Sequence, residues 1–398
     1  MKQATELPLP APSRPEPLKW VRENLFNGVW NSLLTIITLV LLFFFLKGAL
    51  SWAFTQARWD VIPANFRLLM VGPYPQESLW RVWAGVMLLN LLAGMHLGNS
   101  NRTRIPAELR NTWLTFLVII AAYSALQFSA PSAKFLPAVF AVLTVAFFVG
   151  RAIKSISTLG WTITWVVGFV AFLFLIGGNL GGGAVTTDLW GGLLLTFLLA
   201  VVAIVASFPL GILLAIGRKS SLPIVSGFCV VFIEVVRGVP LIAVLFMAQL
   251  FLPLFLPDVR IDKVLRAMVA LTIFSAAYLA EYLRGGLQAV PKGQDEAARA
   301  MGLTGTQTMI LIVLPQALRA VVPAIVGQFI SLFKDTSLVA IIGLTDLLGV
   351  ANSITANSNY IGLSKEVYIG ITLIYLFFTI PMARASRAVE ARLNESKR

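Results

Sequence analysis

Long runs of apolar residues, separated by short stretches of polar and charged residues, dominate this chain. Each run is close to the roughly 20 residues that an α-helix needs to cross about 30 Å of hydrocarbon. The runs lie at 30–51, 80–98, 112–130, 135–151, 160–179, 190–216, 224–254, 265–286, 316–333 and 367–386. Because a segment in lipid must satisfy its backbone hydrogen bonds internally, the pattern predicts an all-α integral membrane protein with about ten transmembrane helices.

Composition agrees with this prediction and excludes other classes of protein. The 398 residues are 58% hydrophobic and only 12% charged, values that are not typical of a soluble globular domain. The formal net charge of +13 could suggest a nucleic-acid partner, but the basic residues are scattered between apolar runs, so we expect no nucleic-acid binding. Residues 1–18 carry five prolines among polar residues and predict a flexible tail.

The distribution of basic residues predicts the topology. Short loops that stay in the cytoplasm carry an excess of Lys and Arg. If the chain starts inside, about two thirds of its Lys and Arg residues fall on the inner side. This topology predicts cytoplasmic N- and C-termini and places the polar stretch 287–315 in the cytoplasm.

Residues 291–315 form a polar island in this apolar chain, and their pattern predicts a bent, two-helix knuckle. Asp295 and Glu296 open a run of good helix formers, where carboxylates favour the helix dipole. Gly302 stands where such a helix would stop. A second helix is expected to follow this glycine turn.

That second helix is expected to begin near Gln307. Thr304 and Thr306 can cap its start. Pro315 is expected to interrupt its hydrogen-bond ladder, because proline has no backbone N–H.

The knuckle carries a recognisable spacing of residues. The matching positions are Glu296, Ala297, Ala298, Gly302, Ile312, Leu314 and Pro315. This spacing resembles the EAA loop, the signature of inner-membrane permease subunits of bacterial ABC importers. Three more stretches, 232–241, 277–286 and 334–339, resemble the polar amino-acid branch of that family. The whole chain is similar to the long permease subunit of a general L-amino-acid importer.

The resemblance implies an organisation of the chain. Residues 187–390 would form a type I ABC importer permease domain of about five helices, with a cytoplasmic coupling loop at 287–315. The glycine-rich stretch 177–183 supports a boundary before this domain. Residues 19–186 would form an N-terminal transmembrane region of about five helices. They hold no motif that we recognise, and a packing scaffold, an assembly surface and a lipid-facing spacer remain open.

The resemblance also implies partners and a location in the bacterial inner membrane. Expected partners are two ATP-binding subunits, a second, similar permease subunit, a periplasmic amino-acid-binding protein and the lipid bilayer. ATP and Mg would be bound by the ATP-binding subunits. This chain is expected to bind no cofactor, since its nearest approach to a phosphate-binding loop, residues 211–220, has the wrong spacing. A single cysteine and a single histidine predict no metal site and no catalytic residue.

Ionisable residues at membrane depth are candidates for a substrate path, because charges in hydrocarbon are costly. Glu234 and Arg237 lie three residues apart in one predicted span and can pair with each other. That pair could line a path or serve only structure. A second set could hold the two charges of an amino acid, or its charged members could simply mark the end of a span. This second set is Gln328, Asp335, Thr336 and Ser337.

Two other classes of function remain as alternatives. An ion-coupled secondary amino-acid transporter would act without an ATPase, but we find no internal repeat of the kind common in such proteins. A membrane-embedded enzyme would need paired carboxylates, a metal cluster or a nucleophile with its base. The pattern therefore favours a permease that conducts substrate and does not catalyse a reaction.

Overall fold

The structure is a computed structural model that describes residues 17–100, 135–178, 183–255, 257–258 and 260–395. The chain divides into two compact units, Met1–Trp59 and Asp60–Arg398. The predicted span 112–130, nearly all of the predicted tail 1–18 and most of the glycine-rich stretch 177–183 lie outside the described residues. The proposed boundary at residue 187 stays a prediction.

In the first unit, the described residues form two helices, α1 (Pro17–Leu25) and α2 (Val29–Thr55). Helix α2 corresponds to the first predicted span, and no residue of it is buried in the structure. An apolar helix of 27 residues is long enough to cross the hydrocarbon layer and satisfies its own backbone.

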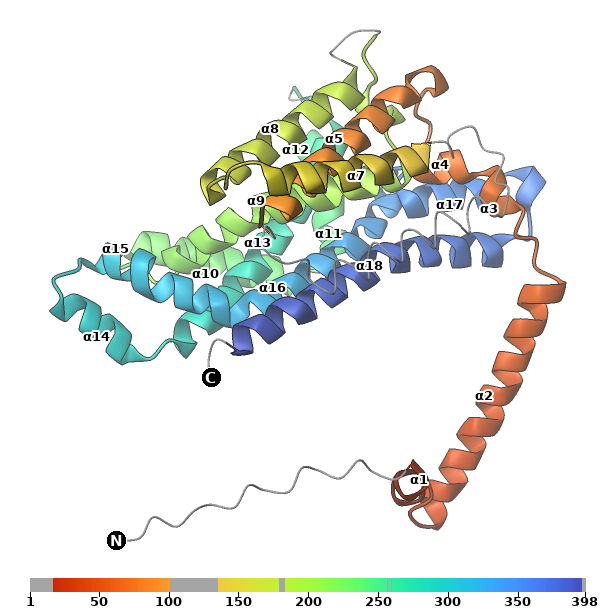
Figure 1. The fold of residues 1–398 in the computed structure, drawn as a ribbon, viewed down its shortest axis with the longest axis horizontal. Coiled ribbons are helices and arrows are strands. Elements are labelled where there is room, and N and C mark those ends of the chain that lie inside the picture. Colours follow the sequence, from red (N-terminus) through yellow and green to blue (C-terminus); the bar gives the residue numbers. More distant parts are fainter. Residues whose placement is uncertain (1–16, 101–134, 179–182, 256, 259, 396–398) are drawn as a thin grey trace. The chain divides into compact units, whose positions relative to one another are not determined.

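The second unit is a helical bundle (Figure 1). Its first part holds α3 (Val61–Ala64), α4 (Phe66–Val71), α5 (Leu79–Ser100), α7 (Phe135–Ala152) and α8 (Thr158–Gly177). The middle part holds α9 (Gly192–Gly217), α10 (Pro223–Gly238), α11 (Leu241–Phe246), α12 (Leu252–Phe255) and α13 (Lys263–Ala289). The last part holds α14 (Lys292–Ala300), α15 (Gly305–Thr308), α16 (Leu314–Asp335), α17 (Leu347–Ala356) and α18 (Ser364–Glu395).

Among the described residues, seven helical segments are long and apolar enough to cross a membrane, and an eighth is added if one bent pair is a single span. The predicted fold class is confirmed: the chain is an all-α integral membrane protein. The count is below about ten because the described part of α7 is too short for this test and 112–130 is not described.

One predicted span is wrong as a single helix. The run 224–254 divides into α10 and a second helix, Leu241–Phe255, which meet at 106°. The break falls at Val239 and Pro240, both in extended conformation. Pro240 cannot donate to the ladder and disfavours a helical residue before it, so the helix ends there and restarts.

Helix α13 lies at the centre of the second unit. Fifteen of its residues are buried, and it packs closely against α9 and α16. Small residues allow this approach: a Cβ on Gly211 of α9 would meet Leu279 at 2.7 Å, and one on Gly286 would meet the Ala317 carbonyl of α16 at 2.6 Å. Because α9 and α16 pack so closely on α13, this helix fixes where the side chains of both neighbours lie.

The two ends of this unit differ. Helix α14 and the C-terminal end of α18 lie at one end, and α3, α4 and α17 lie at the other (Figure 1). This arrangement is the one that the predicted topology requires, with α14 and the C-terminus on the same side of the membrane.

Candidate functional site

Helix α14 forms the first candidate site and stands between α13 and α15, as the sequence predicts. It begins at Lys292 and ends at Ala300. Gly302 has φ +84°, a left-handed conformation that side chains disfavour, and its N–H donates to the Arg299 carbonyl at 2.9 Å. Gly302 thus ends the helix and sets the turn.

The start of the following helix differs from the prediction. Thr304 alone caps it, with Gln307 in a reciprocal capping box, and α15 begins at Gly305, two residues earlier than expected. Pro315 lies just after a π-helical turn, Met309–Val313. The ladder is therefore irregular before the proline, but the chain stays helical from Gly305 through Ile342.

Three of the signature residues, Ala297, Ala298 and Ile312, line one hollow of about 430 Å³ at the side of α14. Ala298 is buried, whereas Glu296 and Ala297 are exposed. Gln316 of α16 donates to Gln294 of α14 at 3.3 Å and ties the two arms of the knuckle together. The remaining signature residues, Glu296, Gly302, Leu314 and Pro315, do not line the hollow.

The exposed side of the knuckle is apolar where solvent would favour polar groups. Met301 is 84% exposed, and Ile310 and Leu311 are also exposed. Ile310 and Leu311 belong to a candidate membrane span, whereas Met301 lies in the turn before it; exposed apolar surface of this kind marks contact with another protein or with the membrane. The knuckle can therefore dock into a groove of a partner.

A second site joins α9, α10 and α13 through five charged side chains. Glu281 of α13 forms ion pairs with Arg218 at 3.4 Å, with Arg237 at 3.4 Å and with Arg284 on its own helix. Arg218, just after α9, also contacts Glu234 at 3.2 Å. We call these five residues the Glu281 cluster. Three arginines and two carboxylates leave the cluster with net positive charge.

The predicted pairing of Glu234 with Arg237 is wrong. Both lie on α10, but each pairs with a residue of another helix, Glu234 with Arg218 and Arg237 with Glu281. Spacing along one helix says which side chains can meet, and a carboxylate packed between three helices offers Arg237 a better partner. The guanidinium of Arg237 also lies 5.6 Å from the ring centroid of Tyr278.

Arg237 keeps one unused donor. Its Nε is buried and has no hydrogen-bond partner among the described residues. The residue stands two positions before the break between α10 and α11. The Arg237 side chain is 31% exposed, and a partly accessible guanidinium is suited to a carboxylate ligand.

The other predicted pathway residues lie on α16 and just after it. Gln328 accepts a hydrogen bond from the Tyr282 hydroxyl at 3.3 Å. Tyr282 lies one helical turn along α13 from Tyr278. Thr336 is buried, and its hydroxyl donates to the Phe333 carbonyl at 2.8 Å. Asp335 and Ser337 are half-buried. Arg237 and Gln328 are thus brought to one stretch of α13, whereas the described ion pair of Arg237 is with Glu281 and not with Asp335.

Sequence reasoning missed Asp346, which is fully buried before α17. Its carboxylate accepts the backbone N–H groups of Leu348 at 3.2 Å and Gly349 at 2.9 Å, and Thr196 of α9 accepts the Leu347 N–H at 3.1 Å. Burial raises the pKa of Asp346 to about 7, although the hydrogen bonds that its carboxylate accepts from Gly349 and Leu348 oppose the shift. An acidic residue before an apolar run is an N-cap signal and could have identified the cap, but not its burial.

Comparison with known proteins decides the family. The family described as "Binding-protein-dependent transport system inner membrane component" matches residues 207–395. "Inner membrane amino-acid ABC transporter permease protein YhdY" of Escherichia coli (strain K12) is 38% identical over 95% of this chain and 93% of that protein. The chain belongs to this permease family.

Of two further relatives, one matches nearly the whole chain and the other matches about half of it. "Glutamate/glutamine/aspartate/asparagine transport system permease protein BztC" of Rhodobacter capsulatus is 37% identical and covers 98% of this permease and 97% of that protein. "Probable glutamine ABC transporter permease protein GlnP" of Bacillus subtilis is 38% identical over 51% of this permease and 93% of that protein. A solved structure described as "Crystal structure of an amino acid ABC transporter with histidines" is 30% identical, covers 60% of this permease and has a TM-score of 0.46.

Proposed function

We propose that this permease carries L-amino acids from a periplasmic binding protein to the cytoplasm, in an importer driven by ATP. The observation that carries the proposal is the match, along nearly the whole chain, to two permeases named for amino-acid transport. The alternative of an ion-coupled transporter that acts alone is not favoured by these relatives. The chain provides the path, and ATP and Mg belong to separate subunits.

Helix α14 is the proposed contact with an ATP-binding subunit. It is exposed on three sides, and its knuckle presents Glu296, Ala297 and Met301 outward. The hollow beside α14 can accept a side chain of the partner. ATP binding would draw two such subunits together and move α14, and the continuous helix from Gly305 to Ile342 would pass this movement across the membrane.

The Glu281 cluster is the proposed part of the substrate path nearest to α14 on this subunit. An amino acid carries a carboxylate and an ammonium group, so a path through low dielectric must offer partners for both at intermediate strength. The Arg237 guanidinium, on a side chain that is 31% exposed, can take the carboxylate, and Glu234, which is 55% exposed, can take the ammonium group. Gln328, Asp335, Thr336 and Ser337 would line the continuation along α16.

The other partners follow from the same proposal. A second, similar permease would complete the path opposite this subunit, and the binding protein would dock at the end that carries α3, α4 and α17. We place the N- and C-termini and α14 in the cytoplasm, because this topology gives the inner side the excess of basic residues.

Reconstitution into liposomes tests the proposal. We expect this chain to co-purify with an ATP-binding subunit and a second permease, and the assembled complex to take up amino acids only with ATP at the α14 side. Competition by a panel of amino acids would give the preference. Uptake by this chain alone, driven by an ion gradient and without ATP, would refute the proposal.

A further inference from the structure

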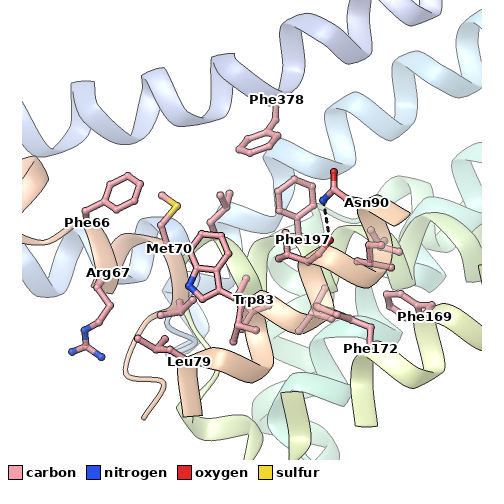
Figure 2. A pocket seen from close by; sticks show the side chains of 18 residues that line it. Phe66, Arg67, Met70, Leu79, Trp83, Asn90, Phe169, Phe172, Phe197 and Phe378 are labelled. Atoms are coloured by element: carbon pink, nitrogen blue, oxygen red, sulfur yellow. Dashed lines mark hydrogen bonds between the residues drawn. The ribbon is translucent and has the colours of Figure 1, made fainter. Parts of the chain in front are cut away.

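A cavity of about 490 Å³ lies between the helices of the first part of the second unit and those that follow. Its walls come from α4, α5, α8, α9 and α18 (Figure 2). On α5 and α9, the lining residues belong to the half that is nearer to α4, so the cavity lies nearer to the end opposite α14. The predicted topology places this end toward the periplasm.

The lining is almost entirely hydrocarbon. Phe66, Trp83, Phe172, Phe197 and Phe378 supply large apolar faces (Figure 2). The cavity also contains one amide, that of Asn90, whose Nδ2 already donates to the Val86 carbonyl at 2.8 Å. An amino-acid substrate does not fit here, because its ammonium group would find no carboxylate among the lining residues.

A single cation stands at the edge of this apolar cavity. Arg67 of α4 is exposed, and one of its donors binds the Tyr74 carbonyl at 3.1 Å. A guanidinium has five N–H donors, and phosphate is a ligand that it binds in bidentate fashion. The combination of an apolar volume and an exposed arginine matches a molecule with an apolar chain and an anionic head.

We propose that this cavity binds one acyl chain of a membrane phospholipid, with the lipid phosphate on Arg67. The volume lies within the range of pockets that hold small apolar ligands. Two segments of the chain itself could compete for the space, residues 112–130 and helix α2. Neither contains Asp or Glu, so neither would bring an anion to Arg67.

Retention of lipid by the purified complex tests the proposal. We expect about one phospholipid per copy of this chain to remain after extended washing in mild detergent, as counted by mass spectrometry. Arg67→Gln should lower this retention at least about tenfold, since glutamine has no charge and cannot make a charge-assisted hydrogen bond to the phosphate. Arg260→Gln, at an exposed arginine that does not line the cavity, is the matched control.

Filling the cavity gives an independent test. Val201→Phe places a ring in the cavity and should abolish retention, whereas Val205→Phe on the same helix, at a residue 63% exposed, should leave it unchanged. Equal retention in the parent, Arg67→Gln and Val201→Phe would overturn the proposal. Equal loss in both phenylalanine variants would overturn it as well.

A fluorescence measurement needs no cavity-filling variant. Phospholipids brominated on the acyl chain should quench Trp83, which lines the cavity, and the quenching should persist after excess lipid is removed. Trp83→Phe should abolish this persistent quenching, and Trp80→Phe, at a residue 56% exposed, should not. The proposal would be overturned if the persistent quenching were the same in Trp83→Phe and in the parent. It would also be overturned if no persistent quenching were seen in the parent.

Discussion

Replacing Glu281 with glutamine tests whether the Glu281 cluster holds three helices together. Glutamine keeps the shape of the side chain and removes its charge. The substitution leaves Arg237 and Arg284 without a carboxylate partner in the cluster, and Arg218 keeps only Glu234. The expected loss therefore comes from unpaired cations and not from packing.

The size of the loss follows from burial. Removing one partner of a fully buried ion pair costs about 3–5 kcal/mol. The Glu281 side chain is 18% exposed, but its partners range from 23% to 37%, so solvent screens part of the interaction. We expect Glu281→Gln to lower the free energy of unfolding by about 2–3 kcal/mol. At about 2–4 °C per kcal/mol, the melting temperature of the purified complex should fall by about 4–12 °C.

The matched control lies in the same cluster. The Glu234 side chain is 55% exposed and contacts one arginine, so Glu234→Gln should cost about 0.5 kcal/mol or less. Melting of all variants is compared at one heating rate, because membrane complexes unfold irreversibly. A Glu281→Gln complex that melts within about 2 °C of the parent would refute the reasoning. So would a Glu234→Gln complex that is destabilised equally.

Three further predictions concern the turn after α14, the buried acid and the path. Gly302→Val should abolish both binding of the ATP-binding subunit and uptake, because φ +84° at this position disfavours any side chain, even though no neighbour lies within 4 Å. The control Gly305→Ala changes an open position without positive φ and should retain both binding, in pull-down assays, and uptake, in transport assays. The pKa of Asp346, about 7, is higher in the folded protein than in the unfolded chain, so folding favours the protonated acid and stability is lost as pH rises toward about 7. The melting temperature should therefore be higher at pH 5 than at pH 8, and Asp346→Asn should remove this difference. Arg237→Gln and Asp335→Asn should each reduce transport without reducing the yield of complex, whereas a purely structural role would lower the yield.

The helices were predictable because the bilayer leaves little choice. A run that must cross hydrocarbon has to be helical, so each predicted run outside residues 101–134 is helical, although 224–254 is broken into two helices. Residues 287–315 were predictable for a different reason, because glycine and capping residues act locally. Gly302 and Thr304 end and begin helices through their own backbone and side chain, without help from distant residues.

Distant contacts were not predictable from spacing. The sequence places Glu234 and Arg237 one turn apart, but the structure gives each a partner on another helix. The break at Pro240 was also missed, since a proline in an apolar run is compatible with a kinked span as well as with two helices. The partner of Arg237 is on α13, many residues away along the chain, and helix spacing alone does not reveal it.

The segment before residue 187 is more than a spacer at the end that carries α4, because it meets the rest of the second unit backbone to backbone. A Cβ on Gly72 would lie 2.4 Å from the Cα of Gly191, and one on Gly192 would lie 2.4 Å from the Leu69 carbonyl. Such approaches require that at least one of the two residues has no side chain. Leu69 is also buried in one cluster with residues of α9, α17 and α18.

Relatives of about half this length show that a permease can be built without such a segment, so here the segment replaces lipid or solvent against those helices. Among the three roles that the sequence leaves open, these contacts favour a packing scaffold.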